Sequence, residues 1–165
     1  MARLDATSAG GIGVLAFLDM LAYSELGPKL LAVSDDGYDV LVGSTWNDVH
    51  RFDSYNDHPQ IFVELPKLGI RSSAAGRYQF LARTWDALAA DLKLTTFAPW
   101  NQDRGAIELI RERNALKDIQ TGRIEHAIER CAPTWASLPG AGYGQHENKM
   151  SALLGAYHEA VKRYA

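Results

Sequence analysis

Residues 14–25 read VLAFLDMLAYSE, and this run decides the first element of the fold. Its apolar residues recur at the i, i+3, i+4, i+7, i+8 spacing of one helical face. Glu25 lies on that face at the end of the run, and the helix-breaking step Leu26-Gly27-Pro28 follows directly. The sequence therefore predicts an amphipathic helix that ends with a carboxylate on its apolar side. The apolar positions are Val14, Phe17, Leu18, Leu21 and Ala22.

Two effects at this position raise the pKa of a glutamate. Burial on the apolar face disfavours the charged form, and the helix dipole repels an anion at the C-terminal end. A carboxyl group that stays protonated near neutral pH is suited to general acid catalysis. The alternative is that Glu25 points to solvent from a frayed last turn, and helix position alone leaves both interpretations open.

The composition is that of one globular domain with no nucleic-acid or membrane partner. The chain has 165 residues, of which 47% are hydrophobic, and a formal net charge of −3. The single cysteine, Cys131, and the five histidines lack the spacing of a metal site, so we expect no metal. The apolar run at 10–18 is too short to cross a bilayer and lacks signal-peptide features. We expect a soluble monomer without an export signal and without stable membrane association.

The pattern along the chain predicts an α+β fold. Residues 1–13 read as a loose tail, and residues 26–72 as a small irregular lobe with strands at 38–43 and 60–64. Residues 73–165 read as a helical lobe. Its expected helices begin near Ser73 and span about 101–114, 118–131 and 150–164, with a glycine-rich loop at 137–144. Glu25 would lie at the junction of the two lobes, where a cleft is natural.

Three polar segments stand out from the helical background, residues 24–25, 72–80 and 140–145, and the last two contain glycine. In the second segment, Tyr78 offers an aromatic face and Gln79 an amide, which together suit a carbohydrate. Core packing is the alternative for Tyr78, because it falls on an apolar stripe. Tyr143 lies between glycines, so helix periodicity does not explain it and we expect it at the rim of a cleft.

These segments resemble the lambda-type phage endolysins, also called the lambda lysozyme family, which are peptidoglycan lytic transglycosylases. The resemblance covers about residues 15–160, in ordered blocks at 17–25, 37–43, 54–59, 75–79 and 135–145. It implies a single lysozyme-like catalytic domain. It also implies cleavage of the β-1,4 bond between N-acetylmuramic acid and N-acetylglucosamine, with a 1,6-anhydromuramyl product. The glutamate of the family's Ser-Glu block is the catalytic acid, and Glu25 matches it.

The resemblance further implies where the glycan strand binds and where the enzyme acts. Segments 57–67 and 138–149 would form the two lips of the sugar groove. Family members carry no cofactor, and they pass from the host cytoplasm to the murein after a holin opens the inner membrane. The chain departs from the family pattern directly after Glu25 and up to Asp36. The polar segments and the matched blocks together give the residues that we expect to bind the substrate. These are Tyr38, Asp39, Asp57, His58, Tyr78, Gln79, Gly142, Tyr143 and Gln145.

Two other functions stay open on the residues alone. A hydrolytic muramidase uses two carboxylates, and Asp39 is the partner that the pattern suggests for Glu25. Asp39 has two further interpretations, as a residue that orients the substrate or Glu25, and as a cap of its strand. A non-catalytic cell-wall-binding module is the third possibility. Asp57-His58-Pro59 reads most simply as a turn, and Trp46 is the tryptophan expected to touch sugar.

Overall fold

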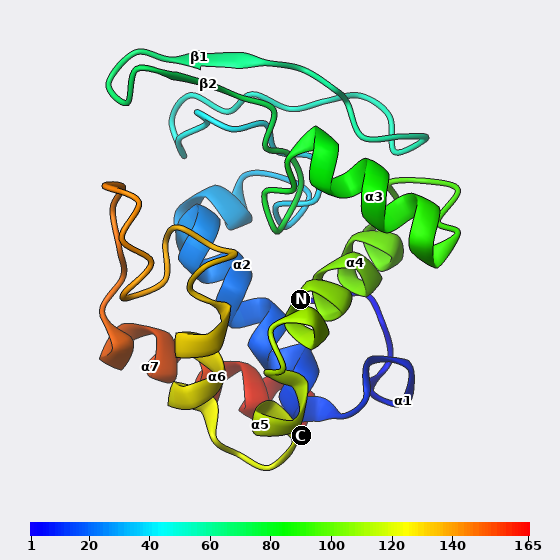
Figure 1. Ribbon diagram of the computed structural model, residues 1–165, viewed down its shortest axis with the longest axis vertical. Helices are drawn as coiled ribbons and strands as arrows, with labels where there is room; N and C mark the ends of the chain where they lie inside the picture. Colours follow the sequence, from blue (N-terminus) through cyan, green and yellow to red (C-terminus); the bar gives the residue numbers. More distant parts are fainter. The chain divides into compact units, whose positions relative to one another are not determined.

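The computed structural model describes residues 1–165, which form seven helices and one two-stranded sheet (Figure 1). The predicted α+β class is confirmed. The chain divides into two compact units, residues 1–25 with 106–165, and residues 26–105. None of the helices combines the length and the apolar character needed to cross a membrane. In chain order the elements are α1 Ala6–Ala9, α2 Ile12–Ala32, β1 Val63–Leu65, β2 Ile70–Ser72, α3 Ala82–Leu92, α4 Pro99–Glu112, α5 Leu116–Gln120, α6 Ile124–Cys131 and α7 Met150–Tyr164.

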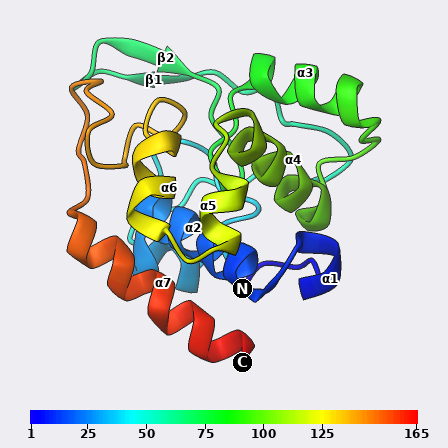
Figure 2. The same cartoon turned by 60° about the horizontal axis from the view of Figure 1, so that its bottom comes forward.

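In the first unit, the opening part of α2 packs against α7 (Figure 2). The predicted apolar stripe of α2 is confirmed, because all five of its residues are buried. A Cβ on Gly13 would lie only 3.1 Å from the Tyr157 hydroxyl, so the two helices approach closely. The buried Asp19 accepts hydrogen bonds from the Ala2 amide at 2.8 Å and from the Tyr164 hydroxyl at 3.1 Å. These contacts tie both ends of the chain to α2.

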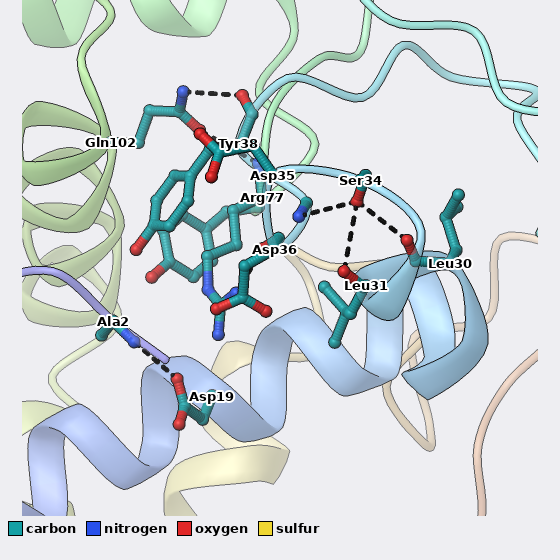
Figure 3. Close-up of polar contacts among 12 residues, drawn as sticks. Ala2, Asp19, Leu30, Leu31, Ser34, Asp35, Asp36, Tyr38, Arg77 and Gln102 are labelled. Carbon is teal, nitrogen blue, oxygen red and sulfur yellow. Dashed lines mark hydrogen bonds and ion pairs between the residues drawn. The ribbon is translucent and has the colours of Figure 1, made fainter.

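The N-terminal residues are ordered, where the sequence suggested a loose tail. Residues 6–9 form the short helix α1, which Asp5 caps by accepting a hydrogen bond from the Ser8 amide at 2.9 Å. Ala2 and Ala9 are buried. Figure 3 shows the Ala2 amide directed at the Asp19 carboxylate. Local sequence does not predict this order, because the two residues that hold Ala2, namely Asp19 and Tyr164, lie elsewhere in the chain.

The expected helix over 118–131 is two helices, α5 and α6. Gly122 interrupts it with a φ of +80°, a left-handed value that glycine adopts without strain. The apolar face of α6 is fully buried and consists of Ile124, Ala127, Ile128 and Cys131. Burial raises the pKa of the Cys131 thiol to about 12, which fits a structural cysteine.

The predicted break after Glu25 is present as a kink inside α2. Gly27 has φ 75° and ψ 158°, which no helix accommodates, and Pro28 then starts one further helical turn. Ser34 closes that turn, because its hydroxyl donates to the Leu30 carbonyl at 2.8 Å (Figure 3). The Ser34 hydroxyl also accepts a hydrogen bond from the Gly37 amide at 3.0 Å. The helix that carries Glu25 therefore ends close to the predicted residue.

The second unit contains less regular sheet than the sequence predicted. β1 and β2 pair antiparallel, with Val63 opposite Ser72 and Leu65 opposite Ile70. The expected strand at 38–43 makes only isolated bridges, from Val40 to Arg51 and from Leu41 to Ala75. The two bridge partners lie in two different segments, each of which meets this stretch at only one residue pair, so no continuous ladder forms.

Residues 73–81 form a tight turn and not the predicted helix. Ala75 and Phe80 exchange two backbone hydrogen bonds, at 3.0 and 2.9 Å. Gly76 and Gln79 have φ values of +80° and +52°, and these left-handed conformations are incompatible with an α-helix. The helix begins only at Ala82. The apolar spacing that suggested a longer helix reflects a turn that directs Tyr78 inward.

Aromatic rings and one buried amide make the core of the second unit. Trp85 and Phe97 pack edge to face with their centroids 4.6 Å apart. The fully buried Gln102 donates to the carbonyls of Tyr38 and Phe97 at 3.0 and 2.9 Å, and accepts from the Arg77 amide at 3.0 Å. Figure 3 shows the Gln102 amide facing the Tyr38 carbonyl. One side chain thus joins the start of α4 to two loops.

We expect Gly76→Ala to destabilise the protein by more than about 2 kcal/mol, through left-handed strain and overpacking combined. A Cβ at this position would overlap the Gln102 amide and lie 2.9 Å from the Phe97 ring. Urea unfolding measures the effect. Gly69→Ala is the matched control, because Gly69 has a φ of +65° with nothing within 4 Å and should lose only about 1 kcal/mol. Equal losses would show that the contact with Gln102 is unimportant.

Candidate active site

Glu25 lies in the last turn of α2 before the kink and is partly buried. The Ser137 hydroxyl donates a hydrogen bond to Glu25 Oε1 at 2.5 Å. Ser137 belongs to the loop between α6 and α7, so one side chain from that loop holds the carboxyl at the end of the helix. The solvent-facing alternative for Glu25 is therefore not supported.

Burial raises the pKa of Glu25 from its ordinary value to about 7. Hydrogen bonds from the Ser137 side chain and backbone oppose this rise, because they stabilise the carboxylate. The net rise in the pKa of Glu25 agrees with the expectation from the helix pattern. A carboxyl with a pKa near 7 gives up and regains a proton at neutral pH, which general acid and base chemistry both require.

Three further polar groups form a chain behind Glu25. The Ser24 and Ser137 hydroxyls lie 2.8 Å apart. Asn148 donates from Nδ2 to the Ser24 carbonyl at 3.0 Å and to the Ser24 hydroxyl at 3.1 Å, and its backbone amide donates to the Ser137 carbonyl at 2.8 Å. Neither Ser137 nor Asn148 was singled out from the sequence. Ser137 lies inside a block that did stand out, but serine is common in loops and nothing local marked it.

The glycine-rich loop after Ser137 is held by its own carboxylate. Glu147 accepts hydrogen bonds from the Gly140 and Gly142 amides at 2.8 and 3.0 Å, and these bonds lower the pKa of Glu147. Tyr143 is 57% exposed, and its hydroxyl donates to the Pro133 carbonyl at 2.6 Å. Gln145 is exposed as well. The loop thus presents an aromatic face and an amide on the surface of the unit that carries Glu25.

Asp39 is buried, and both of its carboxylate oxygens are engaged. Oδ1 accepts from the Asp35 amide at 3.0 Å, and Oδ2 accepts from Arg51 Nε at 2.5 Å. Asp39 and Arg51 line an open hollow of about 650 Å³, together with Tyr55, whose hydroxyl donates to Asp35 at 2.6 Å. Asp39 therefore fixes the backbone at Asp35 and holds Arg51 at the edge of the hollow.

Tyr38 and Tyr78 come together inside the second unit. Their hydroxyls both donate to Oδ1 of the buried Asp103, at 2.7 and 2.6 Å, and both side chains are essentially inaccessible. Burial raises the pKa of each phenol above its usual range. For Tyr78 this favours the core-packing alternative. For Tyr38 it makes direct contact with a substrate difficult.

The Asp57-His58-Pro59 segment has a structural histidine and an exposed aspartate. His58 is buried, its Nε2 lies 2.8 Å from the Phe80 carbonyl, and its Nδ1 accepts from the Gln60 amide. Burial lowers the pKa of His58, so it stays neutral. Asp57 caps the His58 amide at 2.7 Å, in keeping with the predicted turn. Gln79 is half-buried and donates to the Gly76 carbonyl at 2.9 Å.

A second hollow is apolar, and part of its lining comes from the residues that directly follow Glu25 in the sequence. It has a volume of about 400 Å³, and its lining includes Leu26, Pro28 and Trp46. The Trp46 side chain is 55% exposed, and Lys29 Nζ lies 5.1 Å from the centre of its ring. An exposed indole beside a cation and short polar side chains is a surface that suits a pyranose ring. No group of three or more His, Cys, Asp or Glu side chains is arranged to hold a metal ion.

Comparisons with known proteins identify the class of fold. The solved structure of bacteriophage lambda lysozyme complexed with a chitohexasaccharide matches with a TM-score of 0.82 and 44% identity over 97% of both chains. A second structure, lysozyme from bacteriophage lambda, matches with a TM-score of 0.78 and 43% identity over the same shares. The fold is therefore that of the lambda-type lysozymes.

The sequence matches the family described as Endolysin over residues 15–163. The endolysin of Escherichia phage lambda is 48% identical over 147 residues, which cover 88% of this chain and 89% of that protein. The endolysin of Escherichia phage P2 is 46% identical over 151 residues, which cover 89% and 92% of the two chains. The chain belongs to the endolysin family, and the resemblance seen in the sequence is confirmed.

We expect Glu25→Gln to stabilise the protein relative to the native chain increasingly as the pH rises. The pKa of Glu25 is about 7 in the folded state and about 4.5 when unfolded, so folding favours the protonated form. This contribution is complete below the unfolded pKa and is lost as the pH passes the folded one. Between about pH 4 and about pH 8, the difference in unfolding free energy should grow by up to about 3 kcal/mol. A difference that stays constant with pH would contradict a raised pKa.

Proposed function

We propose that this endolysin is a peptidoglycan lytic transglycosylase, in which Glu25 acts first as acid and then as base. The observation that carries the proposal is the Glu25 carboxyl, partly buried, hydrogen-bonded by Ser137 and with a pKa of about 7. One group of this kind serves both steps at neutral pH. A second carboxylate is not required.

In the first step, Glu25 gives its proton to the oxygen that links N-acetylmuramic acid to N-acetylglucosamine. The bond between C1 of the muramyl residue and that oxygen breaks, and the N-acetylglucosamine leaves with a new hydroxyl. The muramyl N-acetyl oxygen stabilises the positive charge at C1. Ser137 holds Oε1, so the proton travels from Oε2.

In the second step, the Glu25 carboxylate removes the proton from the muramyl C6 hydroxyl. The oxygen then bonds to C1 and closes the 1,6-anhydro ring, which releases the N-acetyl oxygen and restores protonated Glu25. An attacking hydroxyl on the same sugar benefits from proximity, because no second molecule has to be positioned. No water is consumed in the cycle.

A hydrolytic muramidase that uses Glu25 with Asp39 is the second candidate. Asp39 is poorly suited to act as a nucleophile, because Arg51 and the Asp35 amide already occupy its two oxygens. If Asp39 attacked the sugar it would become a neutral ester, and the Arg51 guanidinium would lose its carboxylate partner. We therefore assign Asp39 to positioning the loop that borders the hollow.

The substrate is the glycan strand of peptidoglycan, bound by a monomer. The exposed Tyr143, the Gln145 amide and the backbone around Gly142 would contact it from the glycine-rich loop. On the second unit, Asp57, Gln79 and the apolar hollow beside Trp46 are the accessible candidates. We further propose that the protein acts on murein after a holin releases it from the host cytoplasm.

The product of wall digestion tests the reaction type. We expect mass spectrometry of digested, purified peptidoglycan to reveal muropeptides with 1,6-anhydromuramyl ends. These are lighter by one water than hydrolysis products and resist reduction by borohydride. Reducible muramyl ends as the main product would favour the hydrolase.

Glu25→Gln should lower the rate of wall clearing by about a thousandfold, within the range for loss of a general acid. Thermal unfolding controls for folding, since the variant should be at least as stable as the native chain. The native rate should fall as the pH rises through about 7, because the free enzyme must hold the acid proton. Undiminished clearing by the variant would exclude Glu25 as the acid. A native protein that never clears the suspension would favour the cell-wall-binding interpretation.

Trp46→Ala should weaken binding to purified sacculi several-fold, because stacking of an aromatic ring on the apolar face of a sugar contributes on the order of 1 kcal/mol. Co-sedimentation with sacculi measures this in the Glu25→Gln background, where the wall stays intact. Trp100→Ala is the control, since Trp100 is also 55% exposed but does not line the hollow. Equal binding by the two variants would remove Trp46 from the proposed contacts.

A further inference from the structure

The hydrogen bonds that link Asn148, Ser24, Ser137 and Glu25 follow one order from donor to acceptor. The structure assigns to Ser24, Ser137 and Asn148 a positioning role: together they aim the Ser137 hydroxyl proton at Glu25 Oε1, and so reserve Oε2 for proton exchange with the substrate. This inference rests on the proposed function of Glu25 as acid and base. It adds three residues that act through Glu25 and not on the glycan.

The direction starts at Asn148, whose amide faces two backbone carbonyls. The Ser24 and Ser137 carbonyls lie 3.0 and 3.4 Å from Nδ2, and both are acceptors only. The amide nitrogen must therefore point toward them, since a flipped amide would oppose oxygen to oxygen. The same nitrogen donates to the Ser24 hydroxyl at 3.1 Å.

Each serine hydroxyl has one proton to give. Ser24 accepts from Asn148, so its own proton is available to Ser137 Oγ, 2.8 Å away. Ser137 Oγ accepts this hydrogen bond from Ser24 and donates its own hydrogen bond to Glu25 Oε1 at 2.5 Å. The hydrogen bonds then run in one sense from the amide to the carboxyl, and every oxygen in the chain finds a donor.

This order has a consequence for both forms of Glu25. In the carboxylate, the charge-assisted bond from Ser137 offsets part of the desolvation. In the acid, Oε1 stays an acceptor, so the proton occupies Oε2. The chain thus lets Glu25 lose and regain its proton at one oxygen without rearrangement of its neighbours.

The segment that supplies Asn148 also holds the loop in place, so loss of activity alone proves nothing. The Asn148 amide bonds to the Ser137 carbonyl, and the preceding Glu147 bonds to Gly140 and Gly142. A purely structural role would lower stability and activity together and leave the pKa of Glu25 unchanged. The pKa is therefore the readout that separates the two.

The test is a titration of the Glu25 carboxyl by carbon-13 NMR in the full chain, with Glu25→Gln used to assign the signal. We expect Ser137→Ala to raise the pKa of Glu25 by about one unit, since a hydrogen bond to the charged form is lost. Ser24→Ala and Asn148→Ala should raise it by smaller amounts in the same sense. Ser137→Thr, which keeps the hydroxyl, should restore it. Ser151→Ala on the exposed start of α7 is the control.

The falling limb of the pH–rate profile should move to higher pH in the same order. Unchanged Glu25 titrations in Ser137→Ala and Asn148→Ala, with folding intact, would overturn the positioning role even if anhydromuramyl products persist. Shifted titrations with hydrolytic products would instead leave the chain in place and refute the proposed reaction. The two failures are therefore distinguishable.

Discussion

The hydrogen bond from Ser137 to Glu25 joins positions 112 residues apart, and the candidate chemistry depends on it. Burial alone would make the carboxyl hold its proton too tightly, and full hydration would make it lose the proton too early. The pKa near 7 is the balance between desolvation and this donor. The rest of the first unit can be understood as the framework that keeps the donor within 2.5 Å of a helix end.

That framework is built from both sides of the loop. On one side, α6 ends with a buried stripe that includes Cys131, a few residues before Ser137. On the other, Glu147 and Asn148 bond to the loop backbone, and α7 then packs against the first part of α2 through Tyr157. The loop lacks regular structure, yet its ends and its middle are tied to the helix that bears Glu25. Individual hydrogen bonds, and not a β-ladder, fix the position of this loop.

The sequence was most informative where a pattern was local. The α2 stripe, the break after Glu25, α4 and α7 follow from apolar spacing and from Gly27-Pro28, and the raised pKa of Glu25 follows from its place on that stripe. It misled at residues 73–81, because Tyr78 reaches the core through a left-handed turn at Gly76 and not through helix periodicity. Ser137 and Asn148 escaped detection because their roles arise only when distant segments meet. The buried states of Tyr38 and His58 had the same origin.

The kink at Gly27 separates two stretches of backbone within α2. Backbone direction after this residue is set by an extended glycine and a proline rather than by the helix that precedes it. Changes in the loop that follows therefore do not propagate back along α2 to the carboxyl two residues earlier. The departure from the family pattern that we expect directly after Glu25 would therefore begin at this break. The break therefore makes the backbone geometry at the acid independent of the helical turn that follows it.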